Sequence, residues 1–106
     1  MGKIATDLSD IEQKAFEAVQ DTLSNYVKSD RLKPVRNEGW NYFSIKLDSE
    51  DGLELCFISH RKNGSLNNIG FPKVEYDIAS HNIASYKDKL LHKLQEMSVE
   101  NDIPLP

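Results

Sequence analysis

The chain contains a single cysteine, Cys56, and this scarcity limits how the fold can be held together. One cysteine cannot form an intramolecular disulfide, and it cannot supply the several thiolates of a structural zinc site. The three histidines are too widely spaced along the chain for their positions alone to indicate a metal site. We therefore expect no metal and no cofactor, and a core held together by packing.

Long apolar runs are also missing. No segment approaches the roughly 20 residues that a membrane-spanning helix needs, and the N-terminal segment lacks the apolar stretch of a signal peptide. We expect a cytoplasmic protein that makes no membrane contact. Its 106 residues, 39% of them apolar and 28% charged, are expected to form one domain over residues 1–106, with frayed ends at 1–8 and 100–106.

The chain has no excess of positive charge. Thirteen lysines and arginines stand against seventeen aspartates and glutamates, which gives a net charge of −4. Proteins whose affinity depends on neutralising phosphates carry the opposite balance, so this composition argues against nucleic acid as a partner. The acidity suits a basic protein partner, which it would attract by electrostatic steering.

Sequence signatures of catalysis and ligand binding are absent too. There is no glycine-rich phosphate loop, and the acidic turn that begins at Asp48 has its glycine one position too early for an EF-hand calcium loop. Cys56 and His60 point to the same side of one predicted strand, but four residues of strand span about 13 Å, too far for a nucleophile and its base. We therefore expect no catalytic residues. The alternative is a small enzyme in which His60, His81 and Cys56 converge in three dimensions.

Two segments have the periodicity of amphipathic helices. Ser9-Asp10-Ile11-Glu12 forms a capping box, which marks a helix start, and apolar residues continue the helical pattern to about Ser29. A second apolar stripe begins at about Ser80 and ends near Val99. Each stripe needs an apolar surface to cover, and we expect the segment between the two helices to supply it.

The segment from Trp40 to His60 predicts a β-hairpin, because its two halves match when folded about the turn Asp48-Ser49-Glu50-Asp51-Gly52. Pairing Trp40–Asp48 with Gly52–His60 sets apolar residues opposite each other on one face, which we predict to be core: Leu47/Leu53, Ile45/Leu55 and Phe43/Phe57. The other face then carries four further pairs: Lys46/Glu54, Ser44/Cys56, Tyr42/Ile58 and Trp40/His60.

Further strands follow the hairpin. Asn63-Gly64 is a strong turn signal and predicts a third strand over Ser65–Phe71. Lys73–Ile78 alternates between apolar and charged residues and predicts a fourth. Before the hairpin, Pro34 indicates a connector, with only a short extended piece at Val35.

Together these elements predict a two-layer α+β fold of order α-β-β-β-β-α, with an antiparallel meander sheet of three to four strands and two amphipathic helices. The simplest packing places both helices over the face that carries Phe43 and Phe57. A rival arrangement places one helix on each face of the sheet. In that case the face that carries Trp40 and Tyr42 is core as well.

The face with Trp40 and Tyr42 is the one candidate surface that the sequence singles out. Aromatic residues flanked by charge are typical of protein interfaces, so we predict a partner-binding site of seven residues: Trp40, Tyr42, Ile58, His60, Asp48, Glu50 and Asp51. On this basis we expect a non-enzymatic protein-binding domain. Its most specific form is a small acidic inhibitor, or immunity-type neutraliser, of a basic protein such as a nuclease toxin.

The sequence also leaves two other binding partners possible for this face. A single-stranded nucleic acid could stack on the aromatic residues and contact the basic residues Arg61, Lys62, Lys87 and Lys93. A second copy of the chain could also cover the face and form a homodimer.

Overall fold

The computed structural model describes residues 3–36, 42–61, 66–71, 74–77 and 83–103. These residues form six strands, two α-helices and two short 3-10 turns, η1 and η2. Along the chain the elements are β1 (Lys3–Ile4), α1 (Asp10–Thr22), η1 (Ser29–Arg31), β2 (Leu32–Arg36), β3 (Tyr42–Leu47), β4 (Glu54–His60), β5 (Leu66–Phe71), β6 (Val74–Asp77), η2 (Ile83–Tyr86) and α2 (Lys87–Asn101).

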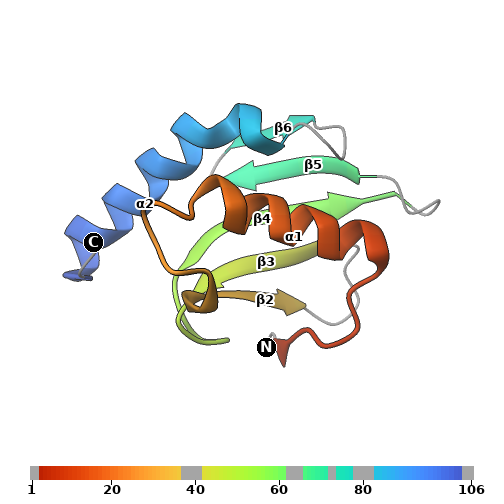
Figure 1. Ribbon diagram of the computed structural model, residues 1–106, viewed down its shortest axis with the longest axis horizontal. Helices are drawn as coiled ribbons and strands as arrows, with labels where there is room; N and C mark the ends of the chain where they lie inside the picture. The colour runs from red at the N-terminus through yellow and green to blue at the C-terminus, as the bar shows by residue number, and fades with distance from the viewer. Residues whose placement is uncertain (1–2, 37–41, 62–65, 72–73, 78–82, 104–106) are drawn as a thin grey trace.

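All six strands join one antiparallel sheet, in which every strand lies beside its neighbours in the chain order β1 to β6 (Figure 1). The α+β class and the meander are confirmed, but the predicted three to four strands are too few. One strand that the sequence did not predict in full is β2, where Pro34 lies opposite Ile45. The Pro34 carbonyl accepts a hydrogen bond from the Ala5 amide at 2.8 Å. The side of β2 that lacks an N–H therefore faces the short edge strand β1, and the ladder to β3 stays intact.

Both edges of the sheet have a backbone group that is bonded by a side chain from elsewhere. At the β1 edge, the Ile4 amide donates to the Glu50 carboxylate at 3.3 Å. At the β6 edge, the Tyr86 hydroxyl donates to the Asp77 carbonyl at 2.6 Å. Residues 3 and 4 are thus part of the sheet, whereas the sequence led us to expect a frayed segment there.

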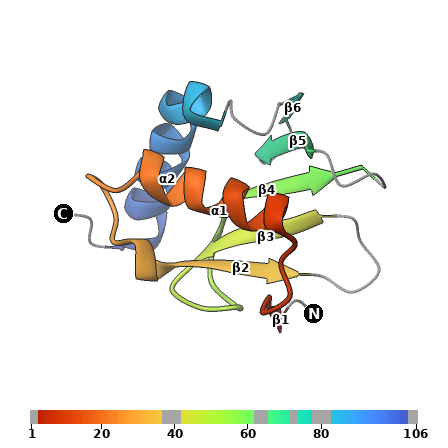
Figure 2. The ribbon, with the colours of Figure 1, turned by 45° about the vertical axis from the view of Figure 1, so that its right-hand side comes forward.

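The two helices pack on the same face of the sheet, as the simpler of the two predicted arrangements requires. Figure 2 shows both helices on the same side of β3, β4 and β5, and their buried residues form one cluster with that face of the sheet. The cluster includes Ala15, Phe16 and Val19 of α1, Leu90, Leu94 and Met97 of α2, and Phe43, Ile45, Ile58 and Ile69 of the sheet. The opposite face of the sheet is therefore covered by neither helix.

The helices differ from expectation mainly at their ends. The capping box is confirmed: the Ser9 side chain accepts from the Glu12 amide, and the Glu12 side chain accepts from the Ser9 amide. However, α1 ends at Thr22 instead of near Ser29. Leu23 and Val27 are buried in the turns that follow, which explains why their spacing extends the helical pattern.

A β-bulge corrects the predicted hairpin register. Lys46 lies opposite Glu54 as expected, but the pairing then shifts by one residue, so that Ile45 faces Cys56. The extra residue is Leu55, and both Leu55 and Cys56 are fully buried. Because a bulge places two residues of one strand against one of the other, every later side chain of β4 changes face.

The bulge reverses the predicted faces of Cys56, Phe57 and Ile58, and His60 likewise lies on the helix side instead of the second face. Cys56 and Ile58 lie in the core, with no exposed surface, whereas we expected them on the second face. Phe57 lies on the second face, opposite Ser44, whereas we expected it in the core. The run Leu-Cys-Phe-Ile is apolar throughout, so hydrophobic alternation fits either register and gives no sign of the bulge.

Candidate functional site: the outer face of the sheet

We call the sheet face away from α1 and α2 the outer face. Residues directly opposite each other on neighbouring strands share a face, so the pairing defines its members. They are Ile4 of β1, Lys33 and Val35 of β2, Tyr42, Ser44 and Lys46 of β3, Glu54, Phe57 and Ser59 of β4, Asn68 and Gly70 of β5, and Glu75 and Asp77 of β6. One row of opposed residues crosses the whole face from β1 to β6: Ile4, Val35, Ser44, Phe57, Gly70 and Glu75.

An aromatic pair lies at the centre of the outer face. The rings of Tyr42 and Phe57 are 5.2 Å apart at their centroids and tilted by 51°, and both side chains are half-buried. Phe57 is held in place by Gly70 on the adjacent strand, because a Cβ atom at Gly70 would collide with the Phe57 ring. Because Gly70 has no side chain, the Phe57 ring packs directly against the β5 backbone. A larger residue at position 70 would occupy the space of the ring.

Next to the aromatic pair, a hydrogen bond positions a carboxylate. Ser44 is only 2% exposed, and its hydroxyl donates to Glu54 Oε1 at 2.6 Å. The register sets Lys46 opposite Glu54, but the Lys46 ammonium donates instead to the Glu50 carbonyl at 3.2 Å. No ion pair of Glu54 occurs among the residues that the structure describes. The carboxylate thus shares the outer face with the aromatic pair and has no described cation as a partner.

Charge is unevenly distributed over the outer face. Lysines lie on the β2 and β3 side, at Lys33 and Lys46, whereas acids lie on the β4 to β6 side at Glu54, Glu75 and Asp77. The Asn68 amide group donates to Glu75 at 2.9 Å, which keeps this carboxylate over the sheet. The β4 to β6 half of the face is therefore rich in acceptors and negative charge.

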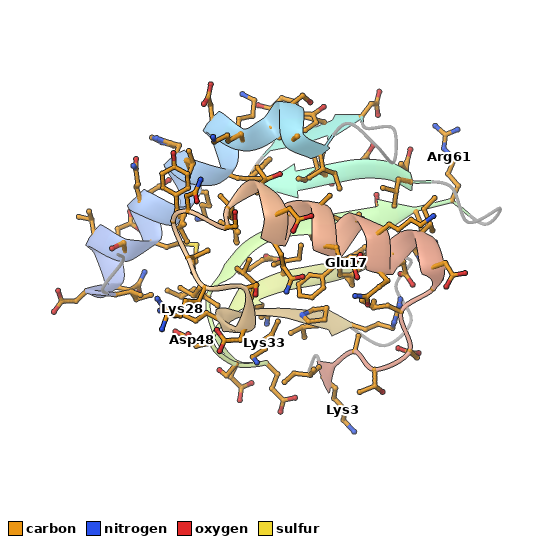
Figure 3. The ribbon with its side chains drawn as sticks, viewed as in Figure 1. Lys3, Glu17, Lys28, Lys33, Asp48 and Arg61 are labelled. Atoms are coloured by element: carbon orange, nitrogen blue, oxygen red, sulfur yellow. The ribbon has the colours of Figure 1, made fainter. Side chains whose placement is uncertain are left out.

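The acidic turn between β3 and β4 is organised by bonds within the molecule. Asp48 has a left-handed backbone, with φ of 72°, and accepts two hydrogen bonds from Arg31, at 2.8 and 3.1 Å. The hydrogen bond from Arg31 holds the pKa of Asp48 below its usual range. Figure 3 shows Asp48 at the same end of the molecule as Lys28 and Lys33. Of the three acids in this turn, Asp48 bonds Arg31 and Glu50 bonds the Ile4 amide of β1. Asp51 makes no described hydrogen bond or ion pair.

The structure brings together only part of the predicted site. Tyr42 lies on the outer face as expected, but Ile58 is in the core and Trp40 lies outside the described residues. His60 points to the helix side. Phe57 is the outer-face aromatic residue that sequence reasoning missed, and the bulge at Leu55, which moves it there, left no signal in the sequence.

His60 belongs to a charge cluster between the start of α1 and the sheet. Its Nε2 lies 3.1 Å from Glu12 Oε2, and Arg36 Nη2 donates to Glu12 Oε1 at 2.7 Å. Glu12 is 3% exposed. Burial alone would raise the pKa of Glu12, but hydrogen bonds from Arg36 and the Ser9 amide, with the charges of Arg36 and His60, hold it below the usual range. The cluster keeps an ionised carboxylate at the helix start, and we assign it a role in positioning α1.

The described residues do not assemble the groups that the enzyme alternative requires. Cys56 is fully buried, and this burial raises the pKa of its thiol far above the usual range, which disfavours the reactive thiolate. His60 contacts Glu12 instead, and His81 lies outside the described residues. Among the residues described, no three His, Cys, Asp or Glu side chains are grouped so that they could hold a metal ion. No described helix is long and apolar enough to cross a membrane.

Comparison with protein-family models gives no match, and comparisons with curated proteins and with solved structures give no significant match.

Proposed function

We propose that this protein is a non-enzymatic protein-binding domain whose outer face packs against a basic protein. One observation carries the proposal: both helices cover the same face of the sheet, and the opposite face has the Tyr42 and Phe57 rings at its centre. Large rings framed by polar groups are typical of the residues that dominate binding energy at protein interfaces. In its most specific form, the proposal is an inhibitor or immunity-type neutraliser of a nuclease toxin.

Charge supports a basic partner. The chain has a net charge of −4, and three acids on β4 and β6 lie on the same face as the aromatic pair. A basic surface would meet complementary charge there, which speeds association and excludes acidic partners. The basic residues that a nucleic acid would need are placed less favourably. Lys87 lies over the Tyr26 ring, on the helix side of the molecule, at 5.7 Å.

The proposal is tested by charge reversal on two surfaces. The test variant Glu54→Lys/Glu75→Lys changes the outer face, and the control Glu17→Lys/Asp21→Lys makes the same charge change on the exposed surface of α1 (Figure 3). Tagged wild type and both variants are used to capture partners from the native host, and the dissociation constant is measured with the purified partner. We expect a stoichiometric basic protein whose affinity falls at least about 100-fold in the test variant and less than about threefold in the control.

Equal retention by both variants, or the absence of any stoichiometric partner, would contradict the proposal. The specific inhibitor form makes one further demand: a captured nuclease must lose its activity at a one-to-one ratio with the wild-type protein. A captured basic protein without nuclease activity leaves the general proposal supported and removes the specific form.

A further inference from the structure

We propose that the outer face recognises an arginine side chain of its partner, which lies against the Phe57 ring and pairs with the Glu54 carboxylate. This inference rests on the proposed function and names the group that the face selects. It is carried by the geometry around Phe57, by the hydrogen bonding of Glu54, and by the way in which the molecule pairs its other carboxylates.

The Phe57 ring is suited to receive a flat cation. It is half-buried, and its position over Gly70 fixes one side against the sheet. A guanidinium stacks on such a ring with both cation–π attraction and apolar contact, and it loses less hydration than an ammonium. Two other rings of the molecule already lie under cations: Lys89 is 4.7 Å from the centroid of Tyr76, and Lys87 lies over Tyr26. Within the described residues, no cation lies over Phe57.

The Glu54 carboxylate lies on the same face of the sheet as this ring, and only one of its two oxygens accepts a hydrogen bond from a described residue. Ser44 is directly opposite Phe57 and donates to Glu54 Oε1, so the carboxylate is held at the residue that faces Phe57 across the strand pair. No described residue donates to Glu54 Oε2. Lys46, the nearest cation by register, is bonded to the Glu50 carbonyl. An incoming guanidinium could therefore donate to the exposed carboxylate without displacing an internal ion pair.

The molecule shows the same chemistry internally at two other carboxylates. Arg31 makes a forked contact with Asp48, and Arg36 bonds the buried Glu12. Among the described residues Glu54 has no arginine partner, and it lies on the same face of the sheet as the half-buried Tyr42 and Phe57 rings. Arginine is favoured over lysine because its planar fork can pair with the carboxylate and stack on the ring together. The remaining acids of the face, Glu75 and Asp77, would then attract further basic residues of the partner.

The inference is tested with a peptide probe that does not require the partner. The probe is acetyl-Gly-Arg-Gly-amide, titrated into the ¹⁵N-labelled full chain at low salt, with citrulline and lysine versions as matched probes. We expect saturable shifts of the Ser44, Glu54 and Phe57 amides, with a dissociation constant in the millimolar range typical of one side chain. The citrulline probe, which has the shape of arginine without its charge, should bind at least about fivefold more weakly, and the lysine probe about threefold.

Two variants assign the site. Glu54→Gln removes the charge but keeps an oxygen to accept from Ser44, so the fold should be unaffected and the arginine probe should bind at least about fivefold more weakly. Glu17→Gln on α1 is the control and should leave the binding unchanged. Equal binding of arginine and citrulline, shifts centred away from Phe57, or full binding to Glu54→Gln would each overturn the inference.

The outcome is separable from that of the proposed function. If the arginine probe fails while Glu54→Lys/Glu75→Lys still abolishes capture of a basic partner, the arginine site is wrong and the binding function stands. If the probe binds as expected but no partner depends on the outer face, the function fails and the site stands. Sedimentation equilibrium identifies the remaining occupant: a dimer of the wild type that Glu54→Lys/Glu75→Lys dissolves would mean that a second copy covers the face, which overturns both.

Discussion

Arg36 Nη2 donates to the Glu12 carboxylate at 2.7 Å and so joins the last residue of β2 to the first turn of α1. The same carboxylate oxygen accepts from the Ser9 amide at 3.0 Å, and His60 on β4 approaches the other oxygen. One buried acid therefore connects the helix start to two strands. A charge that is desolvated in this way is stable only while its partners remain in place.

Replacing Arg36 by methionine should destabilise the fold by about 2 kcal/mol, less than for a fully buried pair because the arginine is partly exposed. The cause is the Glu12 carboxylate, which is left buried with its main donor removed. Urea unfolding of the purified variant measures the loss. The double variant Glu12→Gln/Arg36→Met should be less destabilised than the sum of the single variants by at least about 1 kcal/mol. Additive effects would show that the two residues do not interact in this way.

Acid should weaken the fold partly through Glu12. Because the pKa of Glu12 is lower in the folded chain than its ordinary value of 4.5, the ionised group stabilises the fold above that pH. The contribution is lost as the pH falls through the lowered value, when Glu12 becomes protonated in the folded chain as well. The difference in unfolding free energy between wild type and Glu12→Gln should therefore shrink progressively as the pH falls below the ordinary pKa of 4.5. Urea titrations at several pH values test this, and a constant difference would count against it.

Gly70→Ala should displace the Phe57 ring. The added methyl group would occupy the space of the ring, so we expect a loss of about 1–2 kcal/mol and a change in the ring-current shifts of neighbouring protons. Chemical denaturation and proton NMR spectra measure the two effects. The double variant Gly70→Ala/Phe57→Ala should lose less than the two single variants combined, since the methyl group then meets no ring. Unchanged aromatic resonances in Gly70→Ala would show that Phe57 does not lie over this glycine.

Cys56 should not react with thiol reagents in the folded protein. It is fully buried in the core, next to the bulge residue Leu55, and burial raises the pKa of its thiol. Labelling with a chromogenic disulfide should be slow under native conditions and complete within seconds in concentrated denaturant. The native rate should follow the unfolding equilibrium when small amounts of urea are added. Rapid labelling of the native protein would mean that the thiol is accessible.

Local signals in the sequence predicted the fold class and most of its elements. The capping box at Ser9 marks the start of α1 correctly, because it involves residues only three apart. The sequence predicts only a short extended piece for β2 because a proline such as Pro34 normally interrupts a sheet. Only the three-dimensional structure shows that the side of β2 on which Pro34 lacks an N–H faces the short strand β1. The first strand, Lys3–Ile4, is too short for any periodic signal.

The candidate site was predicted less well than the fold, and one residue is the main reason. Inserting Leu55 as a bulge reverses the faces of Phe57 and Ile58, so the predicted surface exchanged its real aromatic member for a core residue. The direction of His60 also follows from a contact with Glu12, 48 positions earlier in the sequence, as the residue numbers show. Contacts between distant segments of this kind have no local pattern.

The bonded edges of the sheet have a consequence for how this protein behaves at high concentration. The carboxylate of Glu50 on the Ile4 amide and the hydroxyl of Tyr86 on the Asp77 carbonyl each occupy a group that an invading strand would need. Growth of the sheet from one molecule into the next is therefore hindered at both ends, which protects the folded chain against fibril formation. A mutation that frees either group would expose a template for polymerisation while leaving the core untouched.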